Sequence, residues 1–141
     1  MRIGIVSGYF NPLHLGHLEY IEAAKKQVDE LIAIINNDYQ VELKGSKKFM
    51  DELHRAKILS SLRNVDIAVI SVDTDRTVCR SLEKLFDVYH ENNELFFFNS
   101  GDRLGINTES EEVKLCARLG IKYVAIPLPK RYSSSQLKEQ I

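Results

Sequence analysis

Two histidines separated by two residues, His14 and His17, are the side chains whose types and spacing point most directly to chemistry. They lie in the segment GYFNPLHLGH, between an apolar run and an amphipathic stretch. Side chains three positions apart share one face of a helix, and the free amide groups and dipole of a helix start favour bound anions. Gly8 allows close approach of the backbone, and Gly16 leaves the first helical turn open. The segment therefore predicts a polyphosphate site, with both imidazoles donating hydrogen bonds to one phosphate.

This arrangement suits transfer of a phosphoryl or nucleotidyl group, because such reactions need reactants held in line and charge stabilised on phosphorus-bound oxygens. Other interpretations stay open. Either histidine could cap the helix or lie on the surface. The pair could also bind a metal, although no third ligand is evident nearby and structural zinc takes four. The P-loop and nicotinamide-cofactor classes are excluded, because neither of their glycine-rich motifs occurs in the chain.

The elements that must position this segment alternate between strand and helix. Five short runs rich in Ile, Val, Leu or Phe are typical of buried parallel strands and cover residues 3–6, 31–35, 67–70, 95–98 and 123–126. Apolar positions at helical spacing connect them, with Leu18, Leu53 and Ala117 among those expected to face the core, a stop at Gly120 and a last turn from Ser134. The alternation predicts an α/β fold, a single Rossmann-like doubly wound domain over residues 1–141 with a five-stranded parallel sheet. Ligands of such sheets bind beyond the carboxyl ends of the strands.

Charged residues gather after the second strand. Lys44 and Arg55 can bring positive charge to the same polyphosphate. Such a charge cluster is equally typical of a solvated loop, and Arg55 could instead pair with Asp51 or Glu52 on its own helix. We therefore expect a basic loop over the phosphates to which Lys44 and Arg55 contribute.

The ends of the later strands carry further candidates. Arg76 follows the third strand, where it could bind the phosphate of an acceptor. Capping of the next helix explains the segment around Arg76 equally well. We also assign Asp38 to the acceptor site. The fourth strand is followed by Gly101, Asp102 and Arg103, for which a turn with a surface ion pair is the alternative. The last helix opens with Arg131, Ser133, Ser134 and Ser135, whose hydroxyls can cap it or bind phosphate.

The pattern HLGH, preceded by a strand and by GYFN, resembles the signature of the cytidylyltransferase-like nucleotidyltransferase superfamily. The resemblance implies that both histidines contact the nucleotide phosphates and stabilise the transition state. It also implies that Tyr9, Phe10 and Asn11 belong to the nucleotide site. Asn11 stands where many cytidylyltransferases carry an aspartate, and Asn-Pro resembles the adenylyltransferases that act on nicotinamide mononucleotide. The choice between CTP and ATP is therefore left open.

Later segments resemble the same superfamily. Residues 36–66, through LKG, RAKIL and VD, are similar to glycerol-3-phosphate cytidylyltransferases and heptose-phosphate adenylyltransferases, which implies that Lys44 contacts phosphate. The resemblance places residues 101–103 near the base and ribose. Residues 131–135 look like a shortened form of an Arg-x-x-x-Ile-Ser-Thr-Thr motif, in which Arg131 would stabilise phosphate charge and the serines would bond to phosphate oxygens.

The composition limits the partners. The 19 basic and 20 acidic residues nearly cancel, so we expect neither nucleic acid nor a membrane surface as a partner. Cys79 and Cys116 lack metal-ligand spacing, and the first apolar run is too short for a signal peptide, which favours a reducing, cytoplasmic location. Related enzymes are commonly dimers, which allows for a homodimer, but no apolar stripe marks an interface.

These features predict a nucleotidyltransferase. The phosphate oxygen of a phosphorylated small molecule would attack the α-phosphorus of the nucleotide while Mg²⁺ neutralises the leaving pyrophosphate. His14, His17, Lys44 and Arg131 would stabilise the charge. CTP with a small polyol or amino-alcohol phosphate is the first choice, and ATP with a sugar phosphate is the second. A nucleotide-binding regulatory module without turnover is the alternative from another class.

Overall fold

The structure is a computed structural model that describes residues 1–100 and 110–127. Its centre is a parallel sheet of five strands in the order β3-β2-β1-β4-β5. The strands are β1 (Arg2–Gly8), β2 (Glu30–Ile35), β3 (Ile67–Ile70), β4 (Glu94–Ser100) and β5 (Lys122–Ile126). The helices are α1 (Leu15–Lys25), α2 (Asp38–Lys44), α3 (Glu52–Ser60), α4 (Cys79–Tyr89) and α5 (Glu111–Leu119).

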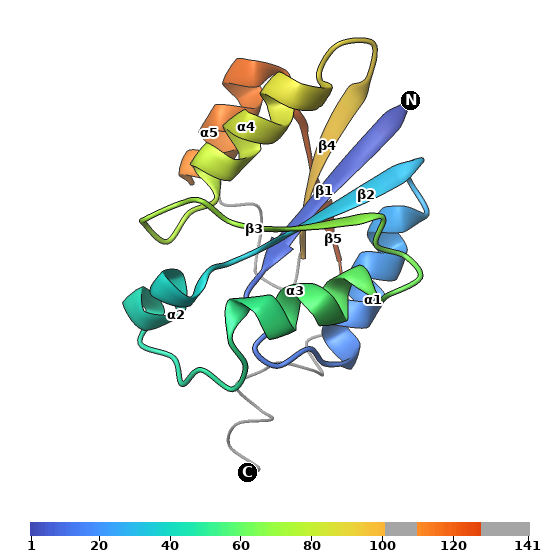
Figure 1. Cartoon of the computed structure of the whole chain (residues 1–141). Helices are drawn as coiled ribbons and strands as arrows, with labels where there is room; N and C mark the ends of the chain where they lie inside the picture. The colour runs from blue at the N-terminus through green and yellow to red at the C-terminus, as the bar shows by residue number, and fades with distance from the viewer. Residues whose placement is uncertain (101–109, 128–141) are drawn as a thin grey trace.

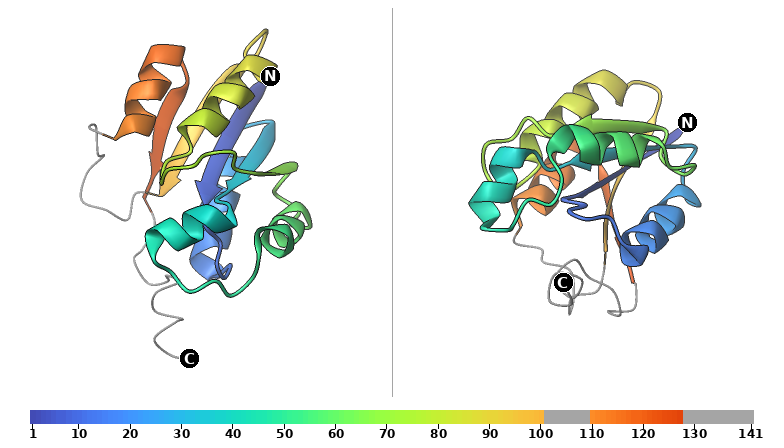
Figure 2. Two further views of the ribbon diagram at one scale, coloured as in Figure 1. Left: turned by 60° about the vertical axis from the view of Figure 1, so that its left-hand side comes forward. Right: turned by 60° about the horizontal axis from the view of Figure 1, so that its bottom comes forward.

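Helices cover both faces of the sheet, which gives three layers (Figures 1 and 2). On one face, Ile21 of α1 and Leu59 of α3 pack into the same buried cluster as Val6 of β1. On the other face, Leu82 of α4 and Leu115 of α5 belong to a second buried cluster. Because the sheet is buried on both sides, its strands are continuous apolar runs rather than alternating ones. The predicted doubly wound α/β fold with a five-stranded parallel sheet is confirmed.

The strand order places the loop after β1 at the middle of the molecule. From β1 the chain adds β2 and β3 on one side, and then crosses to add β4 and β5 on the other. The order therefore reverses between β1 and β4, which is the point where ligands bind in sheets of this type. The loops that leave β1, β2 and β3 meet along the same carboxyl edge, with α2 beside them (Figure 1).

Several helical details differ from the sequence-based expectation. Leu18 is 39% exposed and Leu53 is 71% exposed, so neither belongs to the core, and Ala117 is exposed as well. Ile21 and Ala24 of α1 and Leu59 of α3, which the same spacing predicts to face the core, are buried as expected, and Tyr20 joins them. Apolar spacing identified the buried face only in part, because these short helices also carry apolar residues on their outer side.

The segment after β2, which we interpreted as a charged loop, contains the helix α2. The predicted stop at Gly120 is confirmed, because this residue ends α5 in the left-handed conformation with φ of 83°. The predicted last turn from Ser134 lies outside the described residues. Among the described helices, none has the length and apolar character needed to cross a membrane.

Candidate functional site

The two histidines stack at the start of α1. His14 is the residue that caps the helix, and its Nδ1 accepts a hydrogen bond from the amide of Gly16 at 3.1 Å. The Nδ1 of His17 accepts from the backbone amide of His14 at 3.2 Å. The ring centroids lie 3.8 Å apart at an interplanar angle of 25°. One alternative left open by the sequence, that a histidine caps the helix, is thus correct for His14. The two rings nevertheless lie side by side, as the spacing predicts.

These contacts fix the tautomer of both rings. A neutral imidazole has one donor nitrogen and one acceptor nitrogen. Because each Nδ1 accepts a backbone N–H, the ring proton of each histidine resides on Nε2. Both Nε2–H groups are therefore left as hydrogen-bond donors at the helix start, the arrangement needed to bind phosphate oxygens.

The electrostatic surroundings keep both rings neutral. Burial, together with the nearby His14 and Lys44, lowers the pKa of His17 to about 3. Burial also lowers the pKa of His14. The ring of Phe10 meets His17 edge-on, with centroids 4.9 Å apart. Near neutral pH the rings act as uncharged donors, and Lys44 is the positive group that influences His17.

Phe10 and Asn11 support the loop from inside. Phe10 has a positive φ of 49° and is 1% exposed, and its ring fills the space that a Cβ on Gly8 would enter, at 2.9 Å. Asn11 is 2% exposed; its amide donates to the carbonyl of Lys47 at 2.8 Å and accepts from the amide of Phe49 at 2.9 Å. Both side chains therefore support the loop from inside, and a contact of Gly8, Phe10 or Asn11 with nucleotide stays a prediction. Gly8 makes room for Phe10, and Asn11 fixes the chain between α2 and α3.

Arg55 also supports the loops of the site from inside. Its side chain is fully buried, with 0% exposure. The guanidinium donates to the carbonyls of Tyr9, Asn36 and Met50 at 2.8, 2.6 and 3.0 Å, and to the Asp38 carboxylate at 2.8 Å. These four hydrogen bonds tie the guanidinium to the protein, so Arg55 supports the surrounding loops. Its ion pair is with Asp38 rather than with its helical neighbours, and a contact of Arg55 with nucleotide stays a prediction.

Three loops converge on Tyr9. The Nζ of Lys44, in the last turn of α2, lies 4.3 Å from the centroid of the Tyr9 ring. Burial raises the pKa of Tyr9, while Arg76, at hydrogen-bonding distance from this side chain, opposes the rise. Lys44 and Arg76 therefore reach the loop that carries the histidines. A contact of either residue, or of Asp38, with a phosphorylated substrate stays a prediction.

Two residues near this site were missed by sequence reasoning. Glu112, in the first turn of α5, accepts a hydrogen bond from the amide of Val78 at 3.2 Å, and burial raises its pKa. Gln40 of α2 has 0% exposure and bonds to the loop that carries Arg76. An acidic residue in a first helical turn is a common cap, and a glutamine carries no charge, so neither residue had a sequence signal of function.

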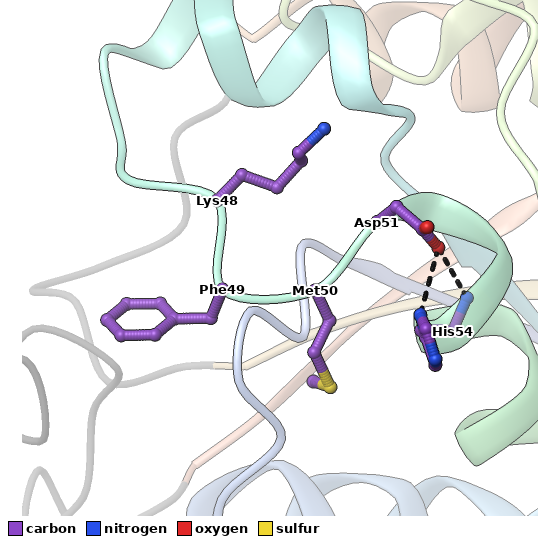
Figure 3. Close-up of a pocket in the computed structure, with 5 residues that line it drawn as sticks. All are labelled: Lys48, Phe49, Met50, Asp51 and His54. Carbon is purple, nitrogen blue, oxygen red and sulfur yellow. Dashed lines mark hydrogen bonds and ion pairs between the residues drawn. The ribbon is translucent and has the colours of Figure 1, made fainter.

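An open pocket of about 350 Å³ lies between α2 and α3 and is lined by Lys48, Phe49, Met50, Asp51 and His54. Figure 3 shows the side chains of Lys48, Phe49 and Met50 pointing in three directions, with Asp51 facing His54. Asp51 caps α3 by accepting from the amide of His54 at 2.8 Å. None of the predicted site residues lines this pocket. The segment that Asn11 holds lines it, and neither histidine of the pair does.

The remaining predicted residues lie outside the described part of the chain. They are Gly101, Asp102, Arg103, Arg131, Ser133, Ser134 and Ser135. Within the described residues, the carboxyl edge of the sheet brings together five of the predicted site residues: His14, His17, Lys44, Tyr9 and Arg76. A sixth, Gly16, donates its backbone amide to the side chain that caps the helix.

The chain combines a doubly wound parallel sheet with a pair of imidazoles at the start of the helix that follows the central strand. This combination of fold and site is typical of nucleotidyltransferases. The sequence model of the family described as "Cytidylyltransferase-like" matches residues 5–140. The chain belongs to the cytidylyltransferase-like family.

Two kinds of curated relative match the chain. FAD synthase of Thermoplasma acidophilum is 28% identical over 108 residues, which cover 74% of this chain and 76% of that protein. The bifunctional protein HldE of Rhodopseudomonas palustris is 43% identical over 72 residues, and that of Geobacter metallireducens is 41% identical over 86 residues. These matches cover 50% and 60% of this chain but only 15% and 17% of the HldE proteins.

Solved structures share the fold. A lipopolysaccharide core biosynthesis protein from Thermoplasma volcanium superposes with a TM-score of 0.68 at 24% identity, covering 94% of this chain and 99% of that one. A putative nicotinate-nucleotide adenylyltransferase from Vibrio parahaemolyticus superposes with a TM-score of 0.66 at 18% identity, covering 98% and 78%. At these identities the likeness establishes the fold alone.

Proposed function

We propose that the chain is an adenylyltransferase that joins the AMP half of ATP to the phosphate of a small molecule and releases pyrophosphate. The observation that carries the proposal is the histidine pair: two neutral rings, stacked at a helix start, each with Nε2–H left as a donor. Donors fixed before the reaction stabilise charge that develops on phosphate oxygens without reorganising. Lys44, close enough to lower the pKa of His17, adds a positive charge at the same place.

ATP replaces CTP as the preferred nucleotide because of the relatives. FAD synthase takes its name from a product that contains AMP, and this relative aligns with most of the chain. The sequence resemblance to heptose-phosphate adenylyltransferases points the same way. The first choice made from sequence, CTP with a polyol or amino-alcohol phosphate, therefore gives way to its alternative, ATP with a sugar phosphate or another phosphorylated acceptor.

The reaction needs positioning more than covalent help. An ionised phosphate oxygen of the acceptor attacks the α-phosphorus of ATP, a new P–O bond forms, and the bond to the β-phosphate bridging oxygen breaks with its electrons leaving on pyrophosphate. The Nε2–H groups of His14 and His17 donate to the phosphate oxygens as charge builds on them. Because the nucleophile is already ionised, no general base is required.

Mg²⁺ is a proposed cofactor that neutralises charge on the nucleotide phosphates when bound. Within residues 1–100 and 110–127 there is no group of three His, Cys, Asp or Glu side chains that could hold a metal. In nucleotide sites magnesium is usually held by substrate phosphates and water with one or two carboxylates, and we propose that mode of binding for this chain.

Pyrophosphate release tests the proposal. Purified protein is assayed with ATP and with CTP, each against heptose 1-phosphate, FMN and glycerol 3-phosphate. We expect release with ATP and at least one acceptor, and a decrease of about a hundredfold or more in turnover for His17→Ala, as for loss of one preorganised donor. His90→Ala, which removes an exposed imidazole at the end of α4, is the matched control and should keep wild-type turnover.

Two results would contradict the proposal. Wild-type turnover in folded His17→Ala would exclude the histidine pair from the chemistry. Tight ATP binding without pyrophosphate release for any acceptor would favour a nucleotide-binding regulatory module instead.

A further inference from the structure

Gln40 holds the backbone on both sides of Arg76. Its side chain is fully buried, and its Nε2 donates to the carbonyls of Asp75 at 2.7 Å and Thr77 at 2.8 Å. These two carbonyls belong to the residues immediately before and after Arg76. The backbone of the loop between β3 and α4 is thus held on both sides of the exposed Arg76 by a buried side chain of α2.

The other atom of the Gln40 amide is anchored to the sheet. Its Oε1 accepts from Asn36 Nδ2 at 3.1 Å, from the Asn37 amide at 3.0 Å and from Ser71 Oγ at 2.6 Å. Asn37 extends the connection by donating to the carbonyls of Ser71 and Asp73, each at 3.0 Å. The ends of β2 and β3 therefore fix the position of Gln40. Both N–H groups of the amide donate and its oxygen is fully occupied as an acceptor, and neither a carboxylate nor an apolar side chain can reproduce this combination.

Arg76 carries an exposed guanidinium at the centre of this anchored loop. Its side chain is exposed, whereas the backbone beside it is held by a buried group. It reaches the side chain of Tyr9, whose ring also lies against Lys44. A guanidinium binds a phosphate through paired, directional hydrogen bonds, so its value as a ligand depends on where its backbone is fixed.

We propose that Gln40 is a positioning residue for acceptor recognition, which fixes Arg76 beside Tyr9 so that the guanidinium binds the phosphate of the acceptor. This inference rests on the proposed function and adds to it: Arg76 and Tyr9 form the acceptor subsite, and Gln40 acts on that subsite through Arg76. The histidine pair and Lys44 serve the nucleotide.

The main test replaces the amide by an isosteric carboxylate, Gln40→Glu, and by an apolar chain of similar length, Gln40→Met. Kinetics are measured with ATP and, in parallel, with heptose 1-phosphate and FMN as acceptor probes. We expect the acceptor KM to rise about tenfold or more, with the KM for ATP and kcat changed less than threefold. Gln27→Glu, which makes the same change at an exposed glutamine, is the matched control and should leave all constants unchanged.

A double-mutant cycle separates positioning from general damage. Arg76→Ala should raise the acceptor KM at least as much as Gln40→Glu does, and the double variant should be no worse than Arg76→Ala alone. Full additivity of the two effects would overturn the inference, as would an unchanged acceptor KM in both Gln40 variants. Loss of the folded state in both variants would also overturn it, because Gln40 would then serve the fold rather than Arg76.

Hydrogen exchange provides a readout that needs no substrate. Amides of residues 72–78 should exchange faster in Gln40→Glu than in Gln27→Glu, while amides of β1 keep their protection. Unchanged exchange in residues 72–78 would overturn the inference. If the wild-type protein transfers no nucleotide to any acceptor, the proposed function fails, and the exchange result still decides whether Gln40 holds the loop.

Discussion

The two histidine rings can serve as neutral donors because their other nitrogens are already used by the helix. Nδ1 of each ring accepts a backbone amide, so the direction of both Nε2–H groups is set by the cap itself. The residue types and their spacing were predictable from the sequence. Their orientation was not, because it depends on the extended backbone of His14, with φ of −140° and ψ of 176°, and on burial by Phe10.

The lowered pKa of His17 predicts a stability that depends on pH. In the unfolded chain a histidine binds a proton below about pH 6.5, whereas burial keeps His17 neutral down to a pKa of about 3 in the folded state. The unfolded state therefore binds more protons as the pH falls from 6.5 toward 3, and the free energy of unfolding decreases there by up to about 1.4 kcal/mol per pH unit. Above pH 6.5 this contribution is constant.

Urea unfolding at pH 7 and pH 5 measures this effect. On going from pH 7 to pH 5, the free energy of unfolding should fall by about 1–2 kcal/mol more for the wild-type protein than for His17→Asn, which has no titrating ring at this position. His90→Asn, at an exposed histidine, should behave like the wild type. Equal pH dependence in His17→Asn and the wild type would contradict the burial of a neutral ring.

Arg55 predicts a large loss of stability when its charge is removed. In Arg55→Met the carboxylate of Asp38 and the carbonyls of Tyr9 and Asn36 lose their donor. Asp38 is 30% exposed and keeps Lys48 at 3.7 Å, whereas each buried acceptor left without its donor costs about 1–3 kcal/mol, so the total loss should be about 3–5 kcal/mol. The free energy of unfolding should fall by that amount, whereas Arg63→Met, at an exposed arginine, should change it by less than about 0.5 kcal/mol. Similar values for the two variants would show that Arg55 is not a structural support.

The helix α2 joins the loops that build the site. It spans seven residues, Asp38–Lys44, too few to be stable in isolation. Its sequence nevertheless carries boundary signals: Asn37 and Gln40 form a capping box, and Gly45 follows the last turn with φ of 77°. The charges of this segment suggested a solvated loop instead. Its contacts with residues 71–77 are between polar groups, for which apolar periodicity gives no signal.

The cap of α2 should therefore contribute more to the free energy of unfolding than an ordinary helix cap does. Asn37→Ala removes the acceptor for the Gln40 amide and also the donor to the carbonyls of Ser71 and Asp73. Loss of a cap costs about 1 kcal/mol, and each lost hydrogen bond adds about 1 kcal/mol. We expect about 2–3 kcal/mol less stability by urea unfolding for Asn37→Ala. Asp51→Ala, which removes the cap of α3, should cost about 1 kcal/mol. A smaller loss in Asn37→Ala than in Asp51→Ala would contradict this account.

At the scale of the whole molecule, the sheet was predictable and the nucleotide was not. The β3 bounds agree with the sequence, and the other four strands extend one or two residues beyond their predicted ends, because parallel strands buried on both faces must be continuous apolar runs. Burial of helical residues was harder to predict, as exposed Leu53 shows. The proposed ligands of the histidine pair are phosphates, which ATP and CTP have in common, so the pair cannot discriminate between the two nucleotides. Selectivity must come from residues that contact the base.

Ligand-linked stability of the whole domain gives a direct measure of that selectivity. A nucleotide that binds only the folded state stabilises it by RT ln(1 + [L]/Kd), which is about 2.7 kcal/mol at a hundredfold excess over Kd. For a domain of this size, that free energy corresponds to a rise in Tm of roughly 10 °C. In a thermal melt with Mg²⁺, ATP should raise Tm at concentrations where CTP does not. A larger shift with CTP would reverse the proposed nucleotide preference while leaving the phosphate role of the histidine pair intact, because both triphosphates would still need the two Nε2–H donors.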